Sequence, residues 1–208
     1  MDKKKSSKKF CIKPNFRTCD LHINCEIYIR LQKENFVGQN FPSFKYKLCI
    51  MKDIKIRKAA LLDLEQLLVF EQDLIKTERP FDPTVKPEPV NYYDIKAMLT
   101  DQRIEMVVAE VNNKVIASGY ARIDKSKPYS RHSHQAYLGF MYVAPEFRGQ
   151  GINKKIMEVL KDWAVAQNVT EFRLEVYCDN APAIKAYEKF GFSRYFLEMR
   201  FNLDDEKK

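Results

Sequence analysis

The sequence predicts an α/β (α+β) fold, in which a mixed and mostly antiparallel sheet is flanked by helices. Stretches with the two-residue period of strands alternate with stretches of helical spacing, and an Asn-Asn pair joins two strand-like stretches as in a tight hairpin. The expected order is strand, helix, helix, strand, strand, strand, helix, strand, helix, strand. Strands and helices alternate throughout a doubly wound sheet, so this order indicates a different architecture.

One strand and two helices are predicted before residue 100. Apolar and charged residues alternate over residues 51–59, as in a strand that opens a domain. Asp63 and Gln66 form the pattern of a capping box, and leucines at helical spacing follow them in a first helix. Four prolines exclude regular structure over residues 79–90, and Tyr92–Leu99 is predicted as a short second helix. We expect the proline-rich stretch to form a wall of a substrate pocket.

The middle of the chain predicts three strands in succession. Ile104–Val111 and Lys114–Ile123 are rich in β-forming residues, and the intervening Asn112-Asn113 pair tolerates the positive φ angles of a hairpin turn. A polar loop over residues 124–133 then leads to a third apolar run, Ala136–Val143. The two strands of the hairpin, Ile104–Val111 and Lys114–Ile123, are expected to be antiparallel neighbours.

The last third predicts helix, strand, helix and strand. Apolar residues recur at helical spacing from Ile152 to about Asn168, and Glu171–Tyr177 follows as a strand. Asn180 then caps a helix that Gly191 ends. Alternating residues predict a final strand over Phe192–Phe201.

The first fifty residues differ in charge from the rest of the chain. Residues 1–50 hold 11 Lys and Arg against 4 Asp and Glu, whereas residues 51–208 hold 25 against 24. The basic charge therefore lies in the first segment, and the nearly neutral remainder lacks the charge of a nucleic-acid-binding domain. We expect a domain over residues 51–208, preceded by a basic extension over residues 1–50 that is disordered or not natively translated, with Met51 as the candidate native start.

Composition and cysteine spacing argue against a membrane protein, an exported protein and a metal site. The chain has no run of about 18 uncharged apolar residues, and its basic N-terminus lacks the apolar stretch of a secretory signal. Four of the five cysteines lie in residues 1–50, at irregular spacings and without a CxxC pair or a histidine cluster. We expect a soluble, cytoplasmic protein with reduced thiols and no metal.

The strongest local signal is a glycine-containing turn between the strand that ends at Val143 and the following helix. Its residues are Arg148, Gly149, Gln150, Gly151, Ile152 and Asn153. Such a turn can direct free backbone N–H groups and the positive end of a helix dipole at a pyrophosphate, and an arginine adds a bidentate donor. Position 154 is lysine where the dinucleotide pattern GxGxxG needs glycine, and no GxxxxGK loop is present. The alternative is a glycine turn that serves packing alone.

A second segment lies about 30 residues further on, from Asn180 to Phe192. With the turn, it resembles the hallmark pair of the GNAT superfamily of N-acetyltransferases, R/Q-x-x-G-x-G/A followed by N-x-x-A-x-x-x-Y-x-x-x-G-F. The resemblance covers about residues 53–201 and is closest between Leu138 and Phe192. It implies a GNAT-like fold and an N-acetyltransferase that transfers an acetyl group from acetyl-coenzyme A to a primary amine of a small molecule or protein by direct attack.

The resemblance also implies which residues bind the cofactor. These are Met141, Tyr142, Val143, the turn from Arg148 to Asn153, Asn180 and Tyr187. The strand backbone and Asn180 would contact the pantetheine arm, the turn would hold the pyrophosphate, and Tyr187 would lie near the sulfur. Asn153 departs from the family, which has glycine or alanine there, and its side chain either crowds the phosphate or donates a hydrogen bond to it.

Glu175 and Tyr187 are the predicted catalytic residues. The Leu-Glu-Val segment around Glu175 looks like that of bacterial ribosomal-protein alanine N-acetyltransferases, and this resemblance implies that Glu175 is the general base. Amines have reference pKa values of about 8 to 10.4, so near neutral pH a base helps them to attack. Tyr187 can donate a proton to the departing thiolate, and a strand N–H near Met141 or Tyr142 can stabilise the oxyanion. Alternatively, Glu175 faces water, Tyr187 only packs and Asn180 only caps its helix.

Two other functions stay open at this point. A catalytically inactive acyl-coenzyme A binding module would agree with Asn153, and the lysines at positions 3–9 could contact nucleic acid or a ribosome. His132 and His134 border the polar loop and are candidates for contact with an acceptor. The expected partners are acetyl-coenzyme A and an amine acceptor, in a monomer or homodimer, without a membrane or nucleic acid.

Overall fold

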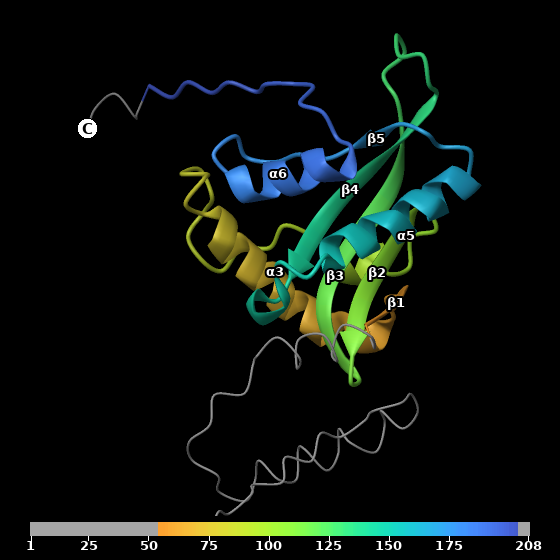
Figure 1. Cartoon of the computed structure of the whole chain (residues 1–208). Coiled ribbons are helices and arrows are strands. Elements are labelled where there is room, and N and C mark those ends of the chain that lie inside the picture. The colour runs from red at the N-terminus through yellow and green to blue at the C-terminus, as the bar shows by residue number, and fades with distance from the viewer. Residues whose placement is uncertain (1–53, 204–208) are drawn as a thin grey trace, which may run out of the picture. The chain divides into compact units, whose positions relative to one another are not determined.

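The computed structural model describes residues 54–203. The expected boundary between an extension over residues 1–50 and a domain over residues 51–208 lies outside the described residues, and so does Met51. The described segment is an α/β domain with a five-stranded sheet and flanking helices, which confirms the fold class that the sequence predicts (Figure 1).

The sheet follows the order of the chain. Its strands are β1 (Lys55–Lys58), β2 (Ile104–Val111), β3 (Lys114–Lys125), β4 (His134–Val143) and β5 (Phe172–Arg173). The first four pair as antiparallel neighbours, and β5 lies parallel to β4. The expected hairpin between β2 and β3 is present, with φ angles of 50° at Asn112 and 60° at Asn113. These angles are tolerated by asparagine, which explains the tight turn.

Helices cover both faces of the sheet. They are α3 (Leu64–Glu78), α4 (Ile95–Met98), α5 (Ile152–Ala166) and α6 (Ala181–Phe190), with short 3-10 helices η1 (Leu61–Asp63) and η2 (Pro145–Phe147). Alternate residues of β2 belong to two different core clusters: Met106 packs with Phe70 of α3, and Val107 packs with Ile156 of α5. Because successive strand side chains point to opposite faces, the sheet separates α3 from α5.

The predicted start of the first helix is wrong in its detail. Asp63 does not cap α3 with its side chain. Its carboxylate instead accepts the Ala60 N–H at 2.8 Å and both terminal nitrogens of Arg57, at 2.7 and 2.9 Å. The Arg57 guanidinium therefore holds the pKa of Asp63 below its usual range. This ion pair joins β1 to η1, the 3-10 helix that precedes α3.

Three predicted elements are shorter than expected or missing. The second helix is limited to α4, since Asp94 accepts the Ala97 N–H and caps it there, and the strand predicted over Glu171–Tyr177 is limited to β5. The final strand predicted over Phe192–Phe201 is not formed, because residues 192–203 join no strand ladder. Their alternating apolar side chains are exposed, as Tyr195 at 76% shows.

Candidate functional site

Strands β4 and β5 are joined at only one end. The paired residues are Ala136 with Phe172 and Tyr137 with Arg173. Beyond Tyr137, no described strand pairs with this edge of β4, so backbone groups up to Val143 face a gap in the ladder. Figure 1 shows β4 running past the end of β5 towards the start of α5. An extended, amide-bearing molecule can pair with such an edge.

A β-bulge interrupts β4 at the beginning of this open edge. The register with β3 shifts between Ser118 and Tyr120, and Phe140 has a φ of 52°. Gly139 is required here because a Cβ atom at this position would lie 2.6 Å from the Tyr120 hydroxyl oxygen. Bulges re-aim a strand and are common beside active sites. A bulge at this position agrees with a candidate site at the centre of β4.

The side chains of the predicted cofactor strand point into the core. Tyr142 packs on Phe70, with ring centroids 4.5 Å apart, and its hydroxyl donates to Asp73 at 3.0 Å. Burial raises the pKa of Tyr142 to about 12, so it stays protonated. Met141 and Val143 pack in the cluster on the α5 side. These side chains are used in packing, which leaves the backbone as the part of the strand available to a ligand.

The glycine turn has a geometry that only glycine adopts easily. Gly149 and Gly151 have φ angles of 74° and 76°, in the left-handed region, and Gly151 is the N-cap of α5. A Cβ atom at either position would have nothing within 4 Å. The packing explanation therefore does not apply, since the backbone conformation and open space are what these glycines provide.

The turn also carries unused hydrogen-bond donors. No described residue accepts a hydrogen bond from the backbone N–H groups of residues 149–154, and the first such bond of α5 is from Lys155 to Gly151 at 3.2 Å. The positive end of the helix dipole lies at the same point. Converging N–H groups at the start of a 15-residue helix form a favourable site for an anion such as a pyrophosphate.

Three side chains of the turn differ in their contacts. Arg148 is exposed, and its Nε donates to the Val143 carbonyl at 2.9 Å, which fixes the guanidinium beside the strand end. Gln150 donates from Nε2 to the Glu146 carbonyl at 3.2 Å. The buried Asn153 Oδ1 has no hydrogen-bond donor among the described residues. Asn153, where the family has glycine or alanine, is thus half-buried near the start of α5 with its side-chain oxygen unpaired among the described residues.

Tyr187 lies half-buried on α6, and this helix has a defined cap at each end. The Asn180 Oδ1 accepts the Ala183 N–H at 3.3 Å and caps α6, and Gly191 ends it with a φ of 123°. The Tyr187 ring packs edge-on against Phe192, with centroids 6.1 Å apart. Burial, with a contribution from the charge of Glu78, raises the pKa of Tyr187 to about 12. The phenol is therefore protonated at neutral pH and able to act as an acid.

Glu175 and Tyr187 have different surroundings. Glu175 is exposed and accepts the Tyr137 hydroxyl at 3.3 Å. The carboxylate whose charge acts on Tyr187 is Glu78, the last residue of α3. Burial and the charge of Asp82 raise the pKa of Glu78 to about 7. Sequence analysis missed Glu78, because a glutamate at the end of an amphipathic helix carries no local signal of burial.

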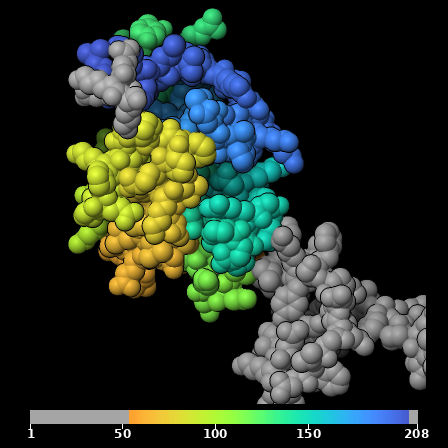
Figure 2. All heavy atoms as spheres, turned by 90° about the vertical axis from the view of Figure 1, so that its left-hand side faces the viewer, coloured from red at the N-terminus to blue at the C-terminus, as the bar shows by residue number. Residues whose placement is uncertain are grey.

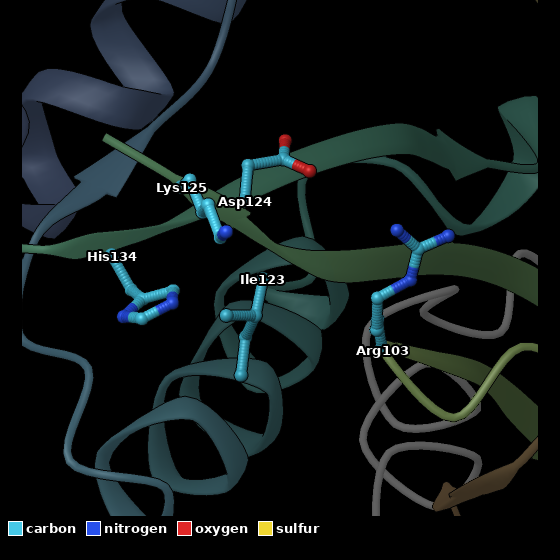
Figure 3. A pocket seen from close by; sticks show the side chains of 5 residues that line it. All are labelled: Arg103, Ile123, Asp124, Lys125 and His134. Carbon is cyan, nitrogen blue, oxygen red and sulfur yellow. The ribbon is translucent and has the colours of Figure 1, made fainter. Parts of the chain in front are cut away.

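The two loop histidines lie at the other end of the β3–β4 hairpin. His132 Nε2 is 3.6 Å from a Glu171 carboxylate oxygen, and His134 Nδ1 is 3.0 Å from the Ser133 hydroxyl. His134 also lines a hollow with Arg103, Ile123, Asp124 and Lys125 (Figure 3). This hollow shares no residue with the turn or with the surroundings of Tyr187.

Residues 54–203 contain neither a candidate metal centre nor a candidate membrane span. In this part of the chain, no three His, Cys, Asp or Glu side chains are grouped so that they could hold a metal ion. None of its helices combines the length and apolar character needed to cross a membrane. Cys178 is an exposed free thiol, and the other four cysteines lie outside the described residues.

Comparisons with known proteins point to one family. The family model described as Acetyltransferase (GNAT) family matches residues 71–192. N-alpha-acetyltransferase 30 of Saccharomyces cerevisiae is 30% identical over 124 residues, which cover 57% of this chain and 68% of that protein. L-amino acid N-acetyltransferase AaaT of Escherichia coli is 29% identical over 147 residues, covering 68% and 84%. The match to N-alpha-acetyltransferase 30 of Schizosaccharomyces pombe, 33% identical, covers 34% of this chain and about half, 47%, of that protein.

Solved structures agree on the fold. A predicted acetyltransferase of Clostridium acetobutylicum, crystallised with acetyl-CoA, has a TM-score of 0.55 and 23% identity, covering 73% of this chain and 97% of that one. Aminoglycoside N-acetyltransferase AAC(6')-Iy in complex with CoA has a TM-score of 0.57 and 16% identity, covering 71% and 98%. At these identities the likeness shows the fold alone.

Proposed function

Because the chain belongs to the acetyltransferase (GNAT) family, we propose that it binds acetyl-coenzyme A and transfers the acetyl group directly to a primary amine of a small molecule or protein. One observation carries the proposal. The open edge of β4 leads straight into a turn whose N–H groups at residues 149–154 have no acceptor among the described residues. A long thioester that ends in a pyrophosphate matches this combination of a strand edge and an anion site.

The cofactor is held mainly by backbone groups in this proposal. The pyrophosphate binds the N–H groups from Gly149 to Asn153, and the exposed Arg148 guanidinium adds charge. The amides of the pantetheine arm pair with the backbone of Met141, Tyr142 and Val143. Asn180 caps α6 through its Oδ1, so its Nδ2 is the part of the side chain available to the pantetheine arm.

The reaction itself needs an acid and an oxyanion site. The amine attacks the thioester carbonyl carbon, the carbon–sulfur bond breaks, and Tyr187 donates its proton to the thiolate. Because burial raises its pKa to about 12, the phenol carries the proton to be donated at neutral pH. A β4 N–H beside the bulge at Phe140 stabilises the oxyanion.

Glu175 is the general base that the family resemblance predicts. Its carboxylate is exposed and accepts a hydrogen bond from the Tyr137 hydroxyl, and it is accessible to an amine. The Glu175→Gln variant tests this role: a base lost at this position would lower kcat/KM for the amine by about 100-fold. Unchanged kcat/KM and an unchanged pH profile would remove Glu175 from the mechanism.

A thiol-release screen tests the proposed function. The full chain and a chain that begins at Met51 are incubated with acetyl-coenzyme A and with amino acids, polyamines, aminoglycosides or peptides bearing a free N-terminus. We expect both chains to bind acetyl-coenzyme A in calorimetry and to release thiol with one of these amine classes. Binding without thiol release across the panel would instead indicate an inactive acyl-coenzyme A binding module. No binding by either chain would overturn the proposal.

A further inference from the structure

Glu78 is a carboxylate with no evident structural use. It is the last residue of α3 and is half-buried, yet no described residue donates a hydrogen bond to its side chain or forms an ion pair with it. The neighbouring Arg79 directs its guanidinium elsewhere, to the carbonyls of Val85 and Lys86 at 3.2 and 2.9 Å. A partly desolvated carboxylate without a partner is costly for a fold to keep.

The groups around Glu78 come from four different parts of the chain. The titratable groups that its charge acts on or that act on it are Asp82, Tyr92, Tyr93, Tyr177 and Tyr187. Asp82 is already engaged: it accepts the Tyr177 hydroxyl at 3.0 Å and the Thr84 N–H at 2.8 Å, and Arg200 lowers its pKa further. Burial raises the pKa of the surrounding tyrosines, so these phenols are neutral. Glu78 is therefore the group in this cluster that lacks an opposite charge.

The segments that meet here form one face of the domain. Figures 1 and 2 both show the end of α3 and the proline-rich segment beside α6. A stacked pair, Phe81 and Tyr177 with centroids 6.2 Å apart, joins the proline-rich segment to the chain between β5 and α6. An ammonium group suits a site with phenol rings and one free carboxylate, through charge and cation–π attraction.

We propose that Glu78, in place of the Glu175 that the family resemblance predicts, is the carboxylate that binds the ammonium group of the acceptor and takes its proton. This proposal rests on the proposed acetyltransferase function and adds a catalytic residue that the family resemblance did not indicate. Its geometric basis is a half-buried carboxylate without a partner among the described residues, at the end of α3, where Figures 1 and 2 show α3 and the proline-rich segment beside α6.

In the proposed step the acceptor ammonium loses two protons, one to Glu78 and one to the Tyr187 phenolate. One ammonium proton moves to a Glu78 oxygen and frees the nitrogen electron pair. The nitrogen bonds to the thioester carbonyl carbon, and the carbon–sulfur bond breaks with its electrons on sulfur. The Tyr187 hydroxyl proton goes to the thiolate, and the phenolate takes the second proton that the new amide nitrogen loses. The products are the amide and the free thiol, and Glu78 releases its proton to water.

Glu78 suits this task through its pKa as well as its position. Burial raises its pKa to about 7, where a base accepts a proton readily and still releases it to water. A chain with this base should show an acidic limb near pH 7 in the pH profile of kcat/KM. The limb reports a group of the free enzyme, so it should depend on Glu78 and not on the acceptor chosen.

The test compares two isosteric variants of the full-length protein, Glu78→Gln and Glu175→Gln. The acceptor is the amine with the fastest thiol release in the wild-type screen, and kcat/KM for it is measured from pH 5.5 to 9, about the range that covers the limb. We expect Glu78→Gln to lower kcat/KM about 100-fold and to abolish the limb, with an unchanged Kd for acetyl-coenzyme A. Glu175→Gln should keep the limb. Glu78→Asp should restore it in part.

The outcomes separate the two proposals. An active wild type whose limb survives in a folded Glu78→Gln variant, or whose limb disappears in Glu175→Gln instead, overturns the role of Glu78 and leaves the acetyltransferase function standing. A wild type that releases no thiol with any amine overturns both. Because Glu78→Gln could act through folding, its melting temperature and acetyl-coenzyme A affinity are measured as well. A loss of rate with normal affinity and with rescue by Glu78→Asp supports the proposal.

Discussion

The proposed cofactor side and the proposed acceptor side of this domain, called the cofactor side and the acceptor side below, use different groups of the chain. On the cofactor side, backbone groups of β4 and of the turn before α5 face the proposed ligand, and the side chains of Tyr142 and its neighbours are used in the core. On the acceptor side, side chains from α3, the proline-rich segment and α6 meet around Glu78. Backbone groups bind one constant cofactor in many sequences, whereas a side-chain cluster can change with the acceptor.

The two sides also differ in how they are held. The turn is fixed by regular elements on either side, β4 and a 15-residue helix. The proline-rich segment has no regular structure and is held by the fully buried Glu71. This carboxylate accepts the Asn91 Nδ2 and the N–H groups of Tyr92 and Tyr93, each at 2.7 Å. One side chain thus anchors the irregular wall of the acceptor side.

The largest effect is expected from Glu71→Ala. It removes the buried acceptor of two half-buried backbone N–H groups and of the Asn91 amide, and the loss of such a hydrogen bond costs about 1–3 kcal/mol where the donor is shielded from water. We expect the free energy of unfolding to fall by about 3 kcal/mol or more, measured by urea denaturation. Glu65→Ala, at an exposed position of the same helix, is the control and should stay within about 0.5 kcal/mol. Equal stability of the two variants would mean that Glu71 does not anchor the segment.

A smaller effect is expected from Gly151→Val. Its control variant separates a loss of cofactor binding from a general effect of backbone strain. Gly151→Val forces a β-branched residue into a left-handed conformation, which costs about 1–2 kcal/mol, and its side chain enters the space above the N–H groups. Calorimetry should show affinity for acetyl-coenzyme A reduced by at least about tenfold. Gly191→Val, with a φ of 123° at the end of α6, suffers similar strain away from the turn. It should lose stability and keep affinity, and a loss of affinity in both would argue against the turn as the phosphate site.

Tyr187→Phe should act on turnover alone. Removing the acid should lower kcat by roughly tenfold or more, about 1.4 kcal/mol, and leave the Kd for acetyl-coenzyme A almost unchanged. Tyr195→Phe removes a hydroxyl from a ring that is 76% exposed and serves as the control. Unchanged single-turnover rates in Tyr187→Phe would exclude the acid role.

The smallest effect is a pH dependence of stability on the acceptor side. Burial raises the pKa of Glu78 to about 7 from 4.5, so the folded state binds the proton more tightly than the unfolded state. The free energy of unfolding should therefore decrease as pH rises from 4.5 to about 7. Glu78→Gln should remove this decrease and raise stability at pH 8 by on the order of 1 kcal/mol, a modest value because the side chain is half-buried. A variant no more stable than wild type at pH 8 would mean that Glu78 is not destabilised by burial.

The cofactor side could be predicted from the sequence because its signals are local. A glycine turn depends on the φ angles of Gly149 and Gly151, and a helix that begins there presents its N–H groups whatever lies around it. The hairpin at Asn112-Asn113 and the cap at Asn180 were predictable for the same reason. Each of these features is decided within a few residues of the chain.

The acceptor side could not be predicted in the same way. Glu78 interacts electrostatically with groups up to about a hundred positions further along the chain, such as Tyr187. No local sequence pattern predicts that these groups come together. The capping box expected at Asp63 failed because Arg57, on a neighbouring strand, offers its carboxylate a stronger partner. The predicted final strand is absent. We attribute this to the short β5, which pairs with β4 over only two residues and offers little edge for a further strand. In each case contacts outside the local pattern, whether formed or missing, decided the outcome.

A structure of the full chain bound to coenzyme A is the decisive test of the proposed cofactor site. We expect the pyrophosphate within hydrogen-bond distance of the N–H groups of residues 149–153, with the pantetheine arm along the open edge of β4 and the sulfur beside Tyr187. A pyrophosphate lodged elsewhere, or a sulfur remote from both Tyr187 and Glu78, would contradict it.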